Sequence, residues 1–369
     1  MNNPLVHIIN KEIFRQKRNI RAVGMDLDGN LTDIHRPEVY SLLWDRTLDF
    51  LPEDLRTHLD GHSFDDMRTI ADFKLGWFLD MELGYLVLPD KGGKIIAVRR
   101  GNEPVRREEI AKIYGNGREI NISQALNPDH EKPRFLPYSD GYDLIEGVIK
   151  SAMTRMDGPP TIRSIQQLDR ALYLAHHSEN GFKQDLMENP EAYGISPNEK
   201  LRDFLAGLKD RYAVFLLTNS HQEYTERILE ALDILEYFDL VIADAKKPAC
   251  FSAERPEKKA LWEQLAAIGI DSPEEVFYMG DHLYKDAISA HQSGFLTGLR
   301  MRRDDITEVE RKLGKYAGMR FETDGHMIRP TTDANEETHE GLNHILFQLR
   351  NHVHVLATKV QNLEPVLLY

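Results

Sequence analysis

Four short apolar runs constrain the fold of this chain more than any other feature. Each is rich in branched or aromatic residues and ends at polar turn residues, a pattern typical of strands buried on both faces of a parallel sheet. The runs cover residues 20–25, 212–217, 238–243 and 276–279. Segments of helical periodicity, residues 225–235 and 258–270, separate the last three runs. This alternation predicts an α/β fold, in which helices cover both faces of a parallel sheet in three layers.

A long section, residues 35–195, separates the first run from the other three. Residues 84–100 contain two β-rich runs joined by Asp-Lys-Gly-Gly, which favours a hairpin. The alternative, a phosphate-binding glycine loop, lacks the helix that should follow it. Residues 139–153 and 162–177 have helical periodicity. We therefore expect an inserted, mainly helical domain.

The remaining residues, 1–34 and 196–369, should form one discontinuous core domain. Its last part, residues 301–369, is expected to be a helical extension that ends in a long helix over residues 339–369. On that helix His352 and His354 would face apart and lie at the surface. Cys250, the single cysteine, excludes an internal disulfide and is expected to be structural.

The composition excludes several classes of partner. Sixty acidic against 46 basic residues give a formal charge of -14, which opposes general binding to nucleic acid or anionic lipid. No apolar run approaches the ~20 residues that a membrane-spanning helix needs. Residues 1–18 lack a secretory apolar core, and Glu12 interrupts the acid-free pattern of a transit peptide. These features predict a cytoplasmic protein that binds neither nucleic acid nor membranes.

Polar residues follow all four apolar runs. In an open parallel sheet these strand ends meet at the edge where ligands bind. The four groups are Asp26 and Asp28; Thr218, Asn219 and Ser220; Asp244 to Pro248, which includes Lys246 and Lys247; and Asp281 with Asp286. Each group alone has an ordinary explanation, such as a solvated turn or a helix cap. Their convergence predicts a magnesium-assisted phosphate site.

Each residue type suits one step of phosphoryl transfer. Asp26 and Asp281 can supply the oxygen ligands that Mg²⁺ prefers, and Asp26 can attack phosphorus to form an aspartyl phosphate. Asp28 can protonate the leaving alkoxide and then accept a proton from water. The equatorial oxygens would be held by Thr218, the amides near Asn219 and Ser220, and a lysine.

The four motifs resemble those of the haloacid dehalogenase (HAD) superfamily of phosphatases and phosphotransferases. They read MDLDGNL, LLTNS, DAKKP and GDHLYKD, in that order. Longer stretches such as FDLVIADAKKP look more specifically like the cytosolic purine 5′-nucleotidase group. The resemblance implies a HAD-like Rossmannoid core, a Mg²⁺ site with Asp26, Asp28 and Asp281 as ligands, and Lys247 as the lysine of the third motif. Asp286 would orient the metal-bound water or Lys247.

The resemblance is weaker in the inserted section, which would form a cap over the substrate. A loose match of YLAHHSENGFK places His176 and Lys183 near the nucleoside, and the alternative for His176 is an ordinary half-buried helix histidine. One departure lies in the first motif, where Asn30 replaces the usual threonine or valine. Asparagine is at ease in turns, so we expect Asn30 to shape this one.

Three functions remain open. The first is Mg²⁺-dependent hydrolysis of nucleoside 5′-monophosphates, with purines preferred and phosphotransfer to a second nucleoside as a further activity. The second is the same chemistry on another small phosphomonoester, and the third is a weakly active regulatory or binding homologue. A dehydrogenase is excluded because no G-x-G-x-x-G follows a predicted strand. The terminal residues could also mediate homo-oligomer formation.

Overall fold

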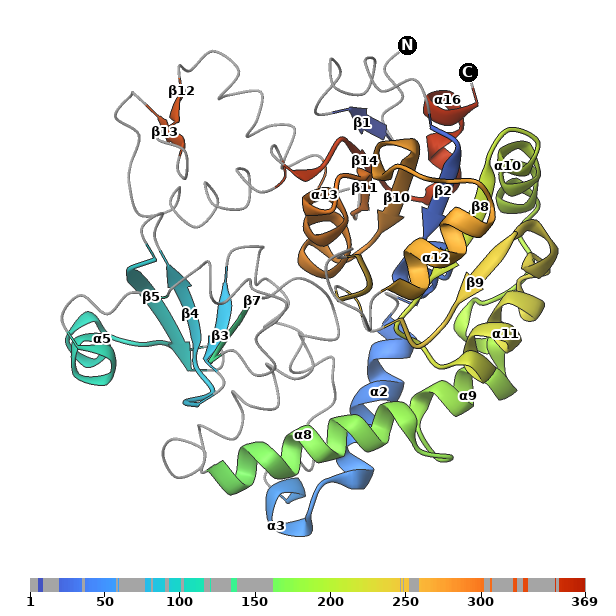
Figure 1. Cartoon of the computed structure of the whole chain (residues 1–369). Coiled ribbons are helices and arrows are strands. Elements are labelled where there is room, and N and C mark those ends of the chain that lie inside the picture. The colour runs from blue at the N-terminus through green and yellow to red at the C-terminus, as the bar shows by residue number, and fades with distance from the viewer. Residues whose placement is uncertain are drawn as a thin grey trace. The chain divides into compact units, whose positions relative to one another are not determined.

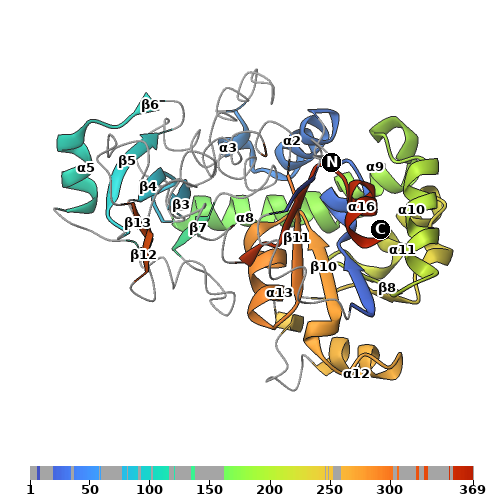
Figure 2. The same ribbon diagram turned by 90° about the horizontal axis from the view of Figure 1, so that it is seen from above.

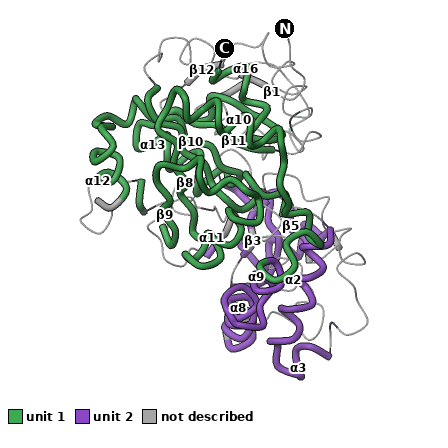
Figure 3. The backbone as a smooth tube through the Cα atoms, turned by 90° about the vertical axis from the view of Figure 1, so that its right-hand side faces the viewer, with its two compact units in different colours: residues 1–34, 187–319, 348–369 green, residues 35–186, 320–347 purple. Residues whose placement is uncertain are grey.

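The computed structural model divides the chain into two compact units. Unit 1 comprises residues 1–34, 187–319 and 348–369, and unit 2 comprises residues 35–186 and 320–347 (Figure 3). The structure describes residues 6–8, 20–34, 37–57, 59, 77–80, 82–89, 93–100, 103–115, 120, 134–137, 162–245, 247, 249–251, 259–301, 306, 321–323, 328–330, 349 and 352–368. The helix expected over residues 139–153 lies outside these described residues.

Unit 1 is built on a seven-stranded sheet with the order β1-β14-β11-β10-β2-β8-β9 (Figure 1). Six neighbouring strands are parallel, and β1 pairs with β14 antiparallel at one edge. The strands are β1 (Val6–Ile8), β2 (Ala22–Met25), β8 (Ala213–Leu217), β9 (Leu240–Ile242), β10 (Val276–Gly280), β11 (Leu296–Arg300) and β14 (Val355–Ala357). The four predicted strands are confirmed, as is the α/β fold class.

Helices cover both faces of this sheet. In Figure 2, α10 (Glu199–Lys209) and α11 (Gln222–Ala231) lie on one face, with α12 (Lys259–Ala267) and α13 (Ser289–Gln292) on the other. Asn198 caps α10, because its side chain accepts a hydrogen bond from the Leu201 amide. Leu261 and Leu265 of α12 pack with Phe215 and Tyr278 of the sheet. The sheet is thus buried on both faces, as its uninterrupted apolar strands require.

The chain end joins this core instead of continuing as one helix. The long helix expected over residues 339–369 is wrong for residues 355–357, which form β14 inside the sheet. Two short helical segments follow, η9 (Val360–Leu363) and α16 (Glu364–Leu367). The surface position expected for His354 is also wrong, because only 1% of this residue is exposed. Its Nδ1 accepts a hydrogen bond from the Thr297 amide at 3.1 Å.

Unit 2 combines helices with a second sheet. Two of its helices, α2 (Pro37–Phe50) and α8 (Ile162–His177), are long, and α3 (Glu53–Arg56), α5 (Arg107–Tyr114) and α9 (Phe182–Glu188) are shorter. The five-stranded antiparallel sheet has the order β6-β5-β4-β3-β7. Its strands are β3 (Phe78–Asp80), β4 (Leu86–Pro89), β5 (Ile95–Arg100), β6 (Glu103–Pro104) and β7 (Phe135–Pro137), and β12 (Phe321–Thr323) pairs separately with β13 (Ile328–Pro330).

The predicted hairpin is present as β4 and β5, but it belongs to a larger sheet than the sequence indicated. The described part of the insertion still has more residues in helices than in strands, so it is mainly helical as expected and carries a sheet in addition. Contacts also assign residues 187–195 to unit 1 and residues 320–347 to unit 2, in contrast to the expected boundaries. No helix among the described residues combines the length and apolar character that crossing a bilayer requires.

Candidate active site

Asp26 stands directly after β2, the strand between β10 and β8. Its amide donates to the Met279 carbonyl at 2.9 Å, which extends the β2–β10 pairing by one residue. The chain then turns through the irregular helical segment η1 (Leu27–Leu31), in which Gly29 has a φ of 71°. A positive φ is easily adopted only by glycine, so this residue allows the chain to turn away from the sheet. Asp26 itself is 8% exposed.

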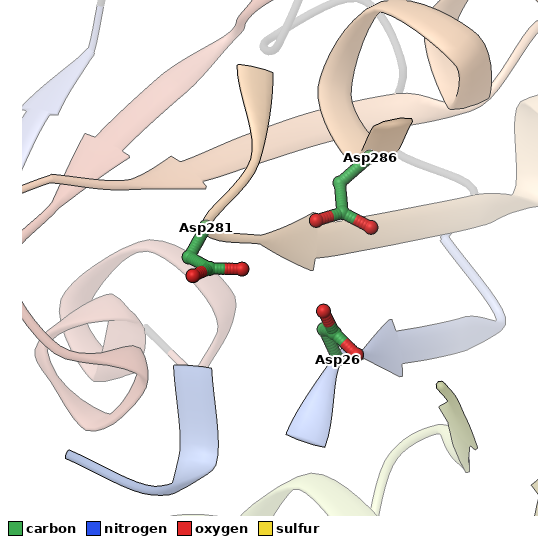
Figure 4. A group of neighbouring side chains, drawn as sticks. All are labelled: Asp26, Asp281 and Asp286. Atoms are coloured by element: carbon green, nitrogen blue, oxygen red, sulfur yellow. The ribbon is translucent and has the colours of Figure 1, made fainter. Parts of the chain in front are cut away.

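Three carboxylates from two distant segments meet at this edge. Asp26, Asp281 and Asp286 each offer an oxygen atom within 4.8 Å of those of the other two. Figure 4 shows their carboxylates turned toward one another, Asp26 from the end of β2 and the other two from the chain after β10. Gly280 makes the approach possible, because a Cβ atom there would lie 2.3 Å from the Asp286 carboxyl.

Lys247 joins two of these carboxylates. Its Nζ lies 2.9 Å from Oδ2 of Asp26 and 2.7 Å from Oδ1 of Asp286. Nζ also lies 3.2 Å from the hydroxyl of Tyr278, which donates to the Leu217 carbonyl at the same distance. Asp286 additionally accepts a hydrogen bond from the His282 amide. The lysine is therefore held by an acid that follows β2 and by two groups from β10 and the segment after it.

The electrostatics of this cluster favour a bound cation. Burial raises the pKa of Asp26 to about 8, with a smaller contribution from Asp286 and Asp281, while Lys247 opposes the change. Burial lowers the pKa of Lys247, but the two carboxylates more than offset this and hold it above its ordinary value. One ammonium group faces three acids, so negative charge remains in excess.

The residues fit a hard divalent cation such as Mg²⁺, which takes carboxylate oxygens as ligands and offsets their mutual repulsion. Asp26, Asp281 and Asp286 are the side chains that could hold it here. Asp28, expected to be a ligand, lies outside this group of three. Asp286, expected to act behind the ligands, belongs to the group and also contacts Lys247.

Both oxygens of Asp28 accept hydrogen bonds from hydroxyl groups. Ser220 Oγ donates to Oδ2 at 2.7 Å, and Tyr224 donates from its hydroxyl to Oδ1 at 2.8 Å. Burial, and then the charge of Asp28, raise the pKa of Tyr224 well above its ordinary value, so its hydroxyl remains a donor. These contacts fix the direction of the Asp28 carboxylate beside Asp26.

The residues after β8 form a compact turn. Thr218 is 1% exposed, and its hydroxyl accepts a hydrogen bond from the Ser220 amide at 3.2 Å. The side-chain oxygen of Asn219 accepts from the Lys247 amide at 2.6 Å, which fixes the third motif against the second. The structure thus brings Thr218, Asn219 and Ser220 to the same strand edge as Lys247. Lys246 lies outside the described residues.

Asn30 has a defined place in the first motif. It is 3% exposed, and its Nδ2 donates to the carbonyls of Met279 at 3.1 Å and Asp26 at 3.4 Å. These bonds tie the turn after Asp26 to β10. The departure from threonine or valine is therefore accommodated by side-chain to backbone hydrogen bonds.

His176 and Lys183 belong to unit 2, where the structure describes their immediate surroundings. His176 Nδ1 lies 2.7 Å from the Leu172 carbonyl, and its ring packs edge-on against Phe182. Lys183 is 8% exposed. A role in recognising the nucleoside remains a prediction for both residues.

Two tyrosines of the site were missed by the sequence reasoning. Tyr278 lies inside an apolar strand and Tyr224 on the apolar face of α11, so both patterns indicated core residues. Each has a polar hydroxyl on a buried ring, and such hydroxyls need a hydrogen-bond partner. That requirement is the signal that could have drawn attention to them.

Comparisons with known proteins relate this chain to a family. The model of the 5′ nucleotidase family matches residues 9–267. Human 5′-nucleotidase domain-containing protein 1 is 24% identical over 354 residues, covering 80% of this chain and 77% of the relative. For human 5′-nucleotidase domain-containing protein 2 the identity is 22% over 352 residues, with 84% of this chain and 64% of the relative covered.

Solved structures show a looser likeness. A HAD phosphatase from Thermococcus onnurineus aligns at a TM-score of 0.31 and 15% identity, over 80% of this chain and 98% of that one. The family match covers more than half of the residues and includes the first, second and third motifs. The chain therefore belongs to the 5′ nucleotidase family of phosphomonoester hydrolases.

Proposed function

We propose that this protein is a Mg²⁺-dependent 5′-nucleotidase that hydrolyses nucleoside 5′-monophosphates, purine nucleotides above others, through an aspartyl phosphate on Asp26. The observation that carries the proposal is the meeting of Asp26, Asp281 and Asp286 at the strand ends, with Lys247 in contact with two of them. When bound, the cation would polarise the phosphate and screen the acids. Family membership supports the substrate class.

In the first half of the reaction, an oxygen of Asp26 forms a bond to phosphorus as the bond from phosphorus to the ester oxygen breaks. Asp28 gives its proton to that leaving alkoxide, and the nucleoside departs as an alcohol. Lys247 and the turn at Thr218 would balance the charge that spreads over the equatorial oxygens. The contacts of Lys247 with Asp26 and Asp286 support this placement.

In the second half, water attacks the phosphorus of the aspartyl phosphate and Asp28 accepts its proton. The bond from phosphorus to the Asp26 oxygen breaks, which releases inorganic phosphate and restores both carboxyl groups to their starting states. The two hydroxyl donors on Asp28 support this role, because they orient its carboxyl group. We assign base recognition to unit 2, where His176 and Lys183 are the first residues to test.

The test is phosphate release from a panel of purine and pyrimidine nucleoside monophosphates and sugar phosphates, with Mg²⁺ and with a chelator. We expect chelator-sensitive release, highest with purine nucleotides. Asp26→Asn should lower turnover by roughly 10³-fold or more because it removes the nucleophile. Asp203→Asn, which changes an exposed acid on α10, is the matched control.

Three results would count against the proposal. Faster release from sugar phosphates than from any nucleotide would favour another phosphomonoester as the substrate. Retained activity in Asp26→Asn would remove this residue from its role. No chelator-sensitive release from any member of the panel would favour a regulatory homologue.

A further inference from the structure

Arg300 ends β11 at the same edge of the sheet as Asp26, and its guanidinium reaches into the turn that carries Asp28. Its side chain is 11% exposed. Nη1 donates to the carbonyls of Gly29 and Thr32, the latter at 2.9 Å, and Nη2 lies 2.6 Å from Oδ1 of Asp33. Nε donates to the Thr358 carbonyl at 3.1 Å. Arg300 lies outside the four sequence motifs MDLDGNL, LLTNS, DAKKP and GDHLYKD.

The turn needs such a partner because its backbone is irregular. Within η1, Asp28 has an extended conformation and Gly29 a positive φ, so their carbonyls do not follow a regular helical pattern. A backbone hydrogen bond from the Thr32 amide to the Leu27 carbonyl spans the turn. A planar guanidinium can bind several acceptors in fixed directions, whereas an ammonium group is a point charge without that geometry.

Arg300 also connects the turn to the sheet behind it. It pairs with Ala357 in the β11–β14 register, and its Nε binds the Thr358 carbonyl just after β14. The turn is therefore fastened at its carbonyls by Arg300 while Ser220 and Tyr224 hold the Asp28 carboxylate. The two sets of contacts reach the turn after β2 from opposite sides. Arg300 ends β11 on one side of β2 in the sheet order, and Ser220 follows β8 on the other.

We infer that Arg300 is a positioning residue for catalysis, which holds the η1 turn so that Asp28 stays within reach of the ester oxygen. The inference rests on the proposed function, since it assigns to Asp28 the proton transfers described above. Arg300 touches the turn and no reacting group. A misplacement of about 1 Å at a catalytic group can cost roughly 10²-fold in rate, so the hydrogen bonds of Arg300 to the turn can control turnover.

The experiment compares Arg300→Lys and Arg300→Gln with the wild type in steady-state kinetics. Both variants should lower kcat by about 10- to 100-fold and leave KM within about threefold, because binding does not use this side chain. Arg202→Lys is the matched control. This arginine is in the same unit, pairs with Asp233 at the surface, and should leave kcat and KM unchanged.

Hydrogen exchange of the peptide covering residues 27–33 supplies a second measurement that does not depend on activity. It should be about tenfold faster in both Arg300 variants and unchanged in Arg202→Lys. Full kcat in Arg300→Lys would overturn the inference, because charge alone would then be sufficient. Unchanged exchange, or a higher KM at unchanged kcat, would also overturn it. If the wild type releases no phosphate, the proposed function fails. The exchange data then still test whether Arg300 holds the turn in place.

Discussion

The contacts of Asp28 show how much of a motif residue's surroundings the motif itself does not reveal. The order and spacing of the motifs predicted that Asp28 would lie at the same strand end as Asp26. The sequence did not reveal that Asp28 would bind Ser220 and Tyr224, of which Tyr224 lies outside every motif. Its ring is fully buried, so its helical spacing matches that of an ordinary core residue.

We predict that Tyr224→Phe lowers kcat by roughly tenfold with little change in KM. The substitution leaves the ring in place and removes one donor from Asp28, so the carboxyl group loses part of its orientation. It should also lower the free energy of unfolding by about 1 to 2 kcal/mol, since a buried hydrogen bond is lost. Steady-state kinetics and urea unfolding measure the two effects.

Tyr212→Phe provides the control, because it removes a similar hydroxyl bond, 2.6 Å to the Leu367 carbonyl, away from the three acids. It should reduce stability to a similar extent and leave kcat unchanged. Equal losses of kcat in the two variants would mean that Tyr224 acts only through stability.

At the level of elements, the sequence predicted the strands that carry motifs better than the strands that do not. The runs at β2, β8, β9 and β10 are apolar and end at polar turns. β11 contains Thr297 and Gly298, and β14 is three residues long beside two histidines, so neither gives a clear apolar run. Tertiary pairing with β10 and β11 determines these two strands, and local pattern does not reveal it.

Unit 2 has an element-level feature of its own, a buried acid in its sheet. Asp80 is fully buried, and it accepts hydrogen bonds from the Tyr114 hydroxyl at 2.9 Å and from Nη2 of Arg134 at 3.0 Å. The amides of Glu82 and Leu83 donate to the same carboxylate. Burial and the charge of Asp80 raise the pKa of Tyr114, so its hydroxyl stays protonated as a donor. The acid thus joins β3, α5 and the residue before β7.

We predict that Asp80→Ala lowers the free energy of unfolding by about 3 kcal/mol, because Arg134 and Tyr114 lose their shared buried partner. Hydrogen exchange should increase across residues 78–115. Glu82→Gln is the control, since this exposed acid also pairs with Arg134 and should change stability by less than about 0.5 kcal/mol. Similar losses of unfolding free energy in both variants would show that the burial of Asp80 does not increase its contribution to stability.

At the scale of the whole molecule, the core could be predicted further than the insertion. Parallel strands bring their carboxyl ends to one edge, so the topology alone predicted that Asp26, Lys247 and Asp281 would meet. No equivalent rule places residues within the inserted section. Its sheet pairs β3 with β7, which lie far apart in the sequence, whereas the residue pattern predicted only the local hairpin inside that sheet.

The three acids also predict how the stability of the whole chain depends on pH and on Mg²⁺. The pKa of Asp26 is about 8 in the folded protein against an ordinary value of 3.8. Without a cation, the folded state therefore binds a proton that the unfolded state has lost between these two values. The contribution of Asp26 to stability is then fully present below pH ~4 and declines as the pH rises toward 8.

Mg²⁺ binds the ionised carboxylates of the folded state in competition with that proton. The stabilisation of the folded state by Mg²⁺ should therefore increase as the pH rises from ~4 toward 8. We predict that millimolar Mg²⁺ raises the melting temperature by several degrees at pH 8 and by much less at pH 6, measured at constant ionic strength. Asp281→Asn should weaken the response and Asp203→Asn should retain it. An equal response at both pH values, or an unaltered one in Asp281→Asn, would mean that the ion binds elsewhere, because binding at these carboxylates couples the ion to the titration of Asp26.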